Sequence, residues 1–218
     1  TQAAHPHPFN YQLQRFMIGV TAGLLPVLVS ARGCRDLTSI SASYHSEARD
    51  VFVACLAAVG GLMLSYQGED GTKREEKWLA RFGGLAALAV AWVPTACPAT
   101  HEATYSCLAK FACNSASQGW HIGAAAGVFV VLVRLCWIFK ERAKAKKGTG
   151  KWDSNAALRM HFYRSCIALS TAGVGIIVIN ALEWIQWDTA LFWGEVMVLA
   201  AFSIAWLTAS KLILKEPR

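Results

Sequence analysis

The stretch VFVACLAAVGGLML, residues 51–64, is an unbroken run of small and apolar residues without a charge. The segment directly before it, SISASYHSEARD, sets His45, Arg49 and Asp50 against the start of this run. A long uncharged run of this kind is typical of a helix buried in lipid or in a protein core. The charges before it are therefore either a helix cap or part of a site.

The composition indicates which solvent surrounds such runs. Of 218 residues, 55% are hydrophobic and only 16% are charged, nine are Trp, and the mean hydropathy is +0.34. These values are too apolar for an ordinary soluble domain. A membrane-spanning helix needs about 20 mostly apolar residues. We therefore predict an all-α helix bundle forming one transmembrane domain over residues 1–218, with six spans at about 13–30, 46–66, 79–96, 120–139, 161–182 and 189–214.

The basic residues predict the orientation of these spans. Fifteen Lys and Arg residues fall on one side of the predicted membrane, seven of them between the fourth and fifth spans, and four fall on the other side. Basic loops face the cytoplasm, so we expect both termini to be cytoplasmic in an inner or plasma membrane. The net charge of +7 then reflects topology and weak attraction to membrane lipids. A nucleic-acid partner is not expected, because the basic residues lie in short loops without a recognition fold.

The cysteines divide into three inside the predicted spans and four in the loops on the outer side. Cys55, Cys136 and Cys166 lie inside predicted spans, where Cys usually behaves as a small apolar residue. An even number of cysteines on the oxidising side predicts two disulfides, with one bridge inside the loop 97–119 and one reaching it from the first loop. A zinc site made of these thiols is the alternative, although the spacings lack a short knuckle. The four candidates are Cys34, Cys97, Cys107 and Cys113.

Glu195 is the strongest candidate for a functional residue. It lies in LFWGEVMVLAAF, four residues beyond Leu191, which is about 6 Å along a helix axis. A charge flanked by apolar sequence costs roughly 2.5–3.5 kcal/mol in hydrocarbon, so we expect Glu195 to face the bundle interior with a partner. Two further carboxylates at the same face, Glu183 and Asp188, are expected in a solvated turn.

Four residues at the ends of the second, fourth and sixth spans could converge at the outer face: His45, Asp50, His121 and Glu195. Imidazoles and carboxylates are ligands for zinc or another divalent metal, and they also form ion-binding or proton-relay sites. The simpler interpretation remains open. Asp50 could cap its helix, and both histidines could lie in the membrane interface.

The motif from Ser41 to His45 (SASYH), followed by Asp50, resembles the S-x-x-x-H…D element of the superfamily that joins alkaline ceramidases, progestin and adiponectin receptors and bacterial haemolysin-like proteins. The resemblance implies a zinc ion that activates water on a lipid amide or ester. This chain departs from the pattern, because it has six predicted spans where that superfamily has seven, and its last span lacks H-x-x-x-H. Glu195 and His121 would have to replace the missing pair. The wider pattern, with "PT", "WH" and "GE" at span boundaries, resembles uncharacterised six-span bacterial membrane proteins.

Three classes of function follow from these residues. The first is a metal-dependent, lipid-directed hydrolase, in which His45, Asp50 and His121 hold the metal and Glu195 or Ser41 handles protons. The second is a non-enzymatic lipid- or ion-binding protein or small transporter. The third is an accessory subunit whose outer face binds a protein partner. We expect the first, with the second and the third as alternatives. A serine hydrolase, a retinal protein and a haem protein are not expected, because the chain has no G-x-S-x-G motif, no Lys inside a span and too few facing histidines.

Overall fold

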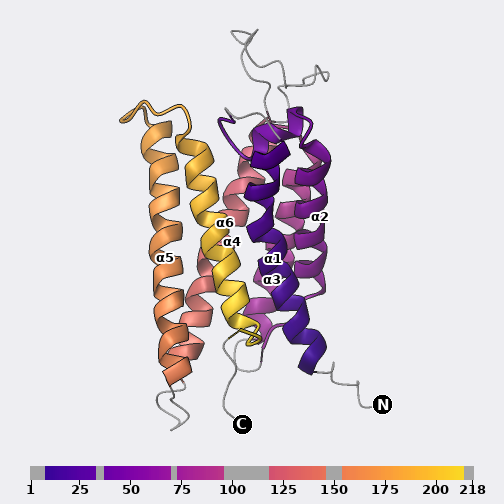
Figure 1. Cartoon of the computed structure of the whole chain (residues 1–218), viewed down its shortest axis with the longest axis vertical. Helices are drawn as coiled ribbons and strands as arrows, with labels where there is room; N and C mark the ends of the chain where they lie inside the picture. The colour runs from indigo at the N-terminus through magenta and orange to yellow at the C-terminus, as the bar shows by residue number, and fades with distance from the viewer. Residues whose placement is uncertain (1–7, 33–36, 70–72, 96–117, 146–153, 214–218) are drawn as a thin grey trace.

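The computed structural model describes residues 8–32, 37–69, 73–95, 118–145 and 154–213. Within these ranges it contains six α-helices and one short 3-10 helix, η1, and no strand, so the all-α prediction is confirmed. The helices lie side by side, and the first turn of α1 and the last turn of α6 lie at the same end (Figure 1). The elements are α1 (Pro8–Arg32), η1 (Ser41–His45), α2 (Arg49–Ser65), α3 (Lys73–Trp92), α4 (Gln118–Ala145), α5 (Ser154–Ala181) and α6 (Ala190–Ala209).

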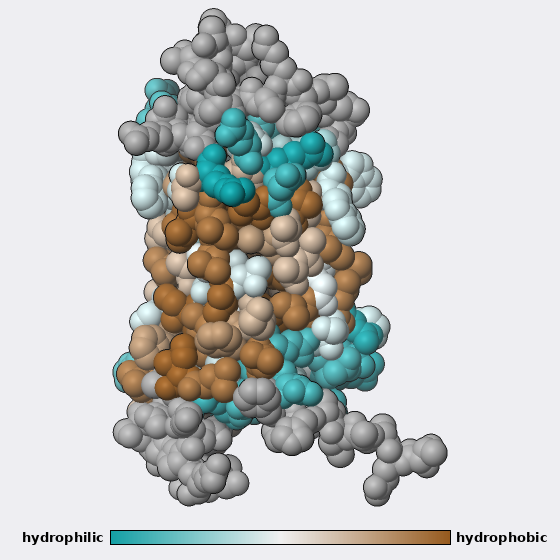
Figure 2. Space-filling view, turned by 45° about the vertical axis from the view of Figure 1, so that its right-hand side comes forward, coloured by the Kyte–Doolittle hydropathy of each residue, from teal (hydrophilic) through white to brown (hydrophobic). Residues whose placement is uncertain are grey.

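Four of the helices have the length and composition of membrane-spanning helices. Their apolar segments are Asn10–Arg32, Gln118–Ala145, Ala156–Ala181 and Ala190–Ala209. The other two are less clear by these criteria, since α2 has 17 residues and α3 begins with the charged sequence KREEK. Apolar residues form a band around the middle of the visible face, and hydrophilic residues gather toward both ends (Figure 2). The chain is therefore built as a membrane protein.

Each helix packs against the next one in the chain, and α6 returns to α1, so the six helices form a closed ring. Further contacts join α4 to α6 across the ring. The largest side chain of the core is Trp206, which is fully buried and packs edge-on against Tyr66, Phe139 and Phe202. In lipid this packing supplies the helix association that the hydrophobic effect does not.

Two pairs of glycines let neighbouring helices approach closely. Gly60 of α2 faces Gly84 of α3, and Gly173 of α5 faces Gly194 of α6. A Cβ atom on Gly194 would lie 2.4 Å from Cγ1 of Ile177 and 2.8 Å from the carbonyl oxygen of Gly173. The glycines therefore serve close packing between helices.

Gly194→Ala is expected to lower the free energy of unfolding by about 1–3 kcal/mol, because the added methyl group forces α5 and α6 apart. Gly175→Ala is the matched control on α5, since a Cβ atom there meets nothing within 4 Å. Unfolding in mixed micelles, followed by circular dichroism, measures both. Equal midpoints for the two variants would contradict the close approach of α5 and α6.

A buried ionic cluster joins the helices at the end where α1 begins and α6 ends. At its centre is Arg15, of which only 2% is exposed. Its Nη1 donates hydrogen bonds to Oε2 of Glu69 (2.7 Å) and to the carbonyl oxygen of Ala209 (2.9 Å), and its Nη2 donates to Oη of Tyr66 (2.6 Å). We call this set the basic-end cluster: Arg15, Tyr66, Glu69, Glu76, Arg142 and Lys211.

The two carboxylates of the basic-end cluster extend it to further elements. Glu76 of α3 is fully buried, accepts a hydrogen bond from Tyr66 Oη (2.9 Å) and pairs with Arg142 of α4. Glu69 accepts from Arg142 Nη1 (2.8 Å) and from Lys211 Nζ (3.1 Å). The cluster thus ties α1, α3, α4 and the segment after α6 together.

Because of this cluster, we expect the folded protein to lose stability in acid. Burial raises the pKa of Glu69, but the charges of Arg15, Arg142 and Lys211 outweigh it and lower the pKa to about 2. A carboxyl with a lowered pKa stabilises the folded state above its ordinary value of 4.5, and this contribution disappears as the pH falls towards 2. The thermal midpoint of the wild type should therefore fall more steeply than that of Glu69→Gln over this range. Parallel curves would contradict the assignment.

Candidate functional site

Residues 37–48, which precede α2, fold into the end of the bundle opposite the basic-end cluster (Figure 1). Their 3-10 helix, η1, buries Ser41, Ser43 and His45. The hydroxyl of Ser43 is satisfied locally, since its Oγ donates to the carbonyl of Ile40 (2.5 Å). The backbone N–H of Phe192 in α6 donates to the carbonyl of Thr38 (3.0 Å). The segment is thereby fixed against α6.

Glu195 of α6 binds this segment from the interior of the bundle. Only 7% of the residue is exposed, and it faces the bundle interior as expected. Its Oε2 accepts the backbone N–H of Ile40 at 2.5 Å, and Ser41 lines the same groove beside it. The partners of Glu195 are therefore groups of the η1 segment. The proposed catalytic pair, Glu195 and Ser41, does lie together.

The two histidines bind the end of α3. Helix α3 ends at Trp92, just before Pro94, and leaves carbonyl groups without helical partners. Nδ1 of His121 lies 2.7 Å from the carbonyl oxygen of Val93, and Nε2 of His45 lies 3.1 Å from that of Thr95. A carbonyl oxygen only accepts, so both of these ring nitrogens carry a hydrogen.

Among the described residues, the second nitrogen of each ring has no partner. Nε2 of His121 and Nδ1 of His45 are buried and form no hydrogen bond within the described part of the chain. The two residues are only 3% and 4% exposed. Buried polar atoms usually have a partner, so an unpartnered ring nitrogen indicates a ligand or water.

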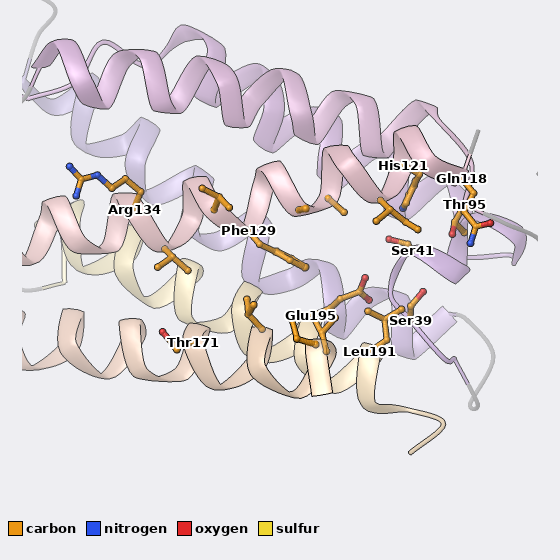
Figure 3. A pocket seen from close by; sticks show the side chains of 18 of the residues that line it. Ser39, Ser41, Thr95, Gln118, His121, Phe129, Arg134, Thr171, Leu191 and Glu195 are labelled. Carbon is orange, nitrogen blue, oxygen red and sulfur yellow. The ribbon is translucent and has the colours of Figure 1, made fainter. Parts of the chain in front are cut away.

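His121 lines a large groove between α4, α5 and α6 (Figure 3). The groove has a volume of about 790 Å³. Along α4 it extends from Gln118 to Trp137, which is about 28 Å at about 1.5 Å per residue. Its η1 end is polar and is lined by Ser39, Ser41, Thr95, Gln118, His121 and Glu195.

The rest of the groove is almost entirely apolar. Phe129 and Val130 of α4 face Val174 and Val178 of α5 along its length. Arg134 lines the far end, but its guanidinium is bound to a carboxylate of α3: Nη2 lies 2.6 Å from Oε1 of Glu75. The groove therefore has one polar end and one long apolar channel.

The structure does not bring Asp50 to this groove. Asp50 lies in the first turn of α2 and is exposed, beside Tyr44 and Arg49. This position fits the cap interpretation, because a carboxylate in the first turn complements the helix dipole. Glu183 and Asp188 are exposed in the connection between α5 and α6, as expected.

The metal expected from the sequence needs at least three ligands that meet. Among the described residues, no three His, Cys, Asp or Glu side chains form a group that could hold an ion. His45 and His121 do lie near each other, but Asp50 is elsewhere and Glu195 is occupied by η1. The described residues therefore do not fit the expected metal. The disulfide candidates lie outside the described residues, and the three helical cysteines are free thiols.

The groove walls are the part of the site that sequence reasoning missed. The stretch GAAAG at residues 123–127 is typical of close packing between helices in lipid, but Ala125 and Ala126 line the groove. Small residues admit a neighbouring backbone and an empty channel equally well. The only sequence signal was the number of consecutive small residues on one helix.

Comparisons with known proteins add no relative. No family model matches the chain, and neither does any curated protein or solved structure. The function is therefore argued from the geometry of the groove.

Proposed function

We propose that this protein binds one membrane amphiphile in the groove between α4 and α5, as a lipid-binding protein or small transporter. The observation that carries the proposal is the groove itself, with a volume of about 790 Å³, apolar walls and polar side chains at one end. Binding sites for small molecules usually have roughly 300–1,000 Å³, mostly apolar walls and a few convergent polar groups.

The dimensions of the groove match a bilayer. Its length along α4, about 28 Å, is close to the roughly 30 Å thickness of the hydrocarbon core. We propose that all six helices span the membrane and that the basic-end cluster lies on the cytoplasmic side, as the loop charges predict. The polar end of the groove then lies in the outer leaflet. An acyl chain can lie along the apolar channel with its headgroup at η1.

The contacts of the polar side chains favour binding over hydrolysis. Oε2 of Glu195 is bonded to the backbone N–H of Ile40, and His121 and His45 use one nitrogen each on the backbone carbonyls that follow α3. No serine–histidine hydrogen bond occurs among the residues that the structure describes, so a base for a nucleophile is not in place there. The groups form a rigid rim, which suits recognition of a headgroup.

Ala126→Trp tests the proposal, because Ala126 lines the groove and an indole ring there fills the channel. Ala58→Trp is the matched control, since Ala58 is an exposed alanine of α2 outside the groove. Both proteins and the wild type are purified in mild detergent, and the retained lipid is measured by native mass spectrometry. We expect about one amphiphile for each wild-type and Ala58→Trp chain, since a groove of this size accommodates about one ligand. Ala126→Trp should lose most of it. Equal retention by both variants, or none by the wild type, would contradict the proposal.

A further inference from the structure

We infer that the amphiphile is a lipid alcohol, whose uncharged headgroup donates a hydrogen bond to Nε2 of His121. This inference rests on the proposed function and names the ligand class. It starts from Nε2 of His121, a buried ring nitrogen with no hydrogen bond among the described residues, in a side chain that lines the groove.

The hydrogen bond that His121 already makes determines which ligand group its free nitrogen, Nε2, can bind. Its Nδ1 donates to the carbonyl oxygen of Val93, so in the neutral ring Nε2 presents a lone pair. A charged imidazolium would be costly here, because the residue is 97% buried and no carboxylate bonds to it in the described part of the chain. The missing partner is therefore a donor, such as O–H or N–H. An ester, an ether or a fully ionised phosphate has no donor to offer.

The neighbouring groups favour a hydroxyl over charged headgroups. No Lys or Arg among the described residues lines the η1 end of the groove, so an anionic phosphate would lack a countercharge. An ammonium would need the carboxylate of Glu195, whose Oε2 already accepts the backbone N–H of Ile40. Ser39, Ser41, Thr95 and Gln118 can each act as donor or acceptor. Together they can satisfy the remaining lone pairs of a hydroxyl oxygen.

The test uses two ligands that differ in one hydrogen-bond donor. Hexadecanol and its methyl ether compete with a fluorescent fatty-chain reporter for the wild-type protein in nanodiscs. Because the ether leaves Nε2 of His121 buried and unpaired, we expect the alcohol to bind about tenfold more tightly. Hexadecylamine and hexadecyl phosphate are the charged probes, and both should bind more weakly than the alcohol.

His121→Phe keeps a ring of similar size but removes the acceptor, so its preference for the alcohol over the ether should vanish. The variant also loses the bond to Val93, so its fold is checked by circular dichroism; the wild-type ratio does not depend on it. Equal displacement by alcohol and ether from the wild type, or tighter binding of the amine or phosphate, would overturn the alcohol inference and leave the groove proposal standing. If none of the four probes displaces the reporter and no lipid is retained, the proposed function itself fails.

Discussion

Arg15→Met is expected to lower the free energy of unfolding by about 3–5 kcal/mol, the range found when one partner of a buried ion pair is removed. Methionine keeps most of the apolar contacts of the arginine stem but removes five N–H donors. The carboxylates of Glu69 and Glu76 then lose a buried cation, and the hydroxyl of Tyr66 loses two bonds. Because the basic-end cluster joins α1 to α3, α4 and α6, the loss should loosen this whole end of the bundle.

Arg134→Met is the matched control for this prediction. Arg134 also pairs with a glutamate of α3, but about half of each side chain is exposed, at 48% and 45%. Exposed pairs contribute only about 0–1 kcal/mol, so the control should be close to wild type. Both variants are compared by urea or mixed-micelle unfolding in the same detergent. Equal unfolding midpoints for the two variants would show that the buried Arg15 contributes less to the free energy of unfolding than we expect.

Glu195→Leu should have the second largest effect. The substitution leaves the buried N–H group of Ile40 without its charged acceptor and removes the carboxylate beside Ser41. Removing a charged acceptor from a buried group costs about 1–3 kcal/mol or more, so we expect a total loss of about 2–4 kcal/mol and a detached η1 segment. Glu195→Gln keeps one acceptor oxygen and should lose less.

Hydrogen exchange read by mass spectrometry measures this directly. In Glu195→Leu the peptide that contains residues 38–46 should exchange faster than in wild type, and the peptides of α1 should change little. Glu47→Leu serves as the control, since Glu47 is an exposed carboxylate next to the same segment. Unchanged protection of residues 38–46 in Glu195→Leu would show that other contacts hold η1.

The sequence predicted the helices well because hydropathy reports the middle of an apolar span. The predicted run 120–139 lies within α4, Gln118–Ala145, and the run 189–214 overlaps α6, Ala190–Ala209. The ends were less accurate. Helix α1 begins at Pro8, before the predicted residue 13, and includes Arg15 at its polar end. Arg15 is accommodated there by its partners in the basic-end cluster, which no local pattern reveals.

The candidate site was predictable only in part. Glu195 was found because an isolated carboxylate in an apolar helix needs a buried partner. His121 and Asp50 were grouped by depth alone, and depth does not say to which side of a helix a residue points. The structure places His121 in the groove and Asp50 on another surface. The groove is a space between helices, and no pattern of residues along the chain predicts such a space.

Photo-crosslinking tests the central claim most directly. A long-chain alcohol with a diazirine in its tail is incorporated into nanodiscs with the wild-type protein, irradiated, and its adducts are mapped by peptide mass spectrometry. The groove predicts adducts concentrated on the facing residues of α4 and α5, such as Phe129, Val130, Val174 and Val178, and their loss in Ala126→Trp. Adducts spread evenly over the exposed apolar residues of α1 to α6, unchanged in Ala126→Trp, would contradict a lipid site in this groove.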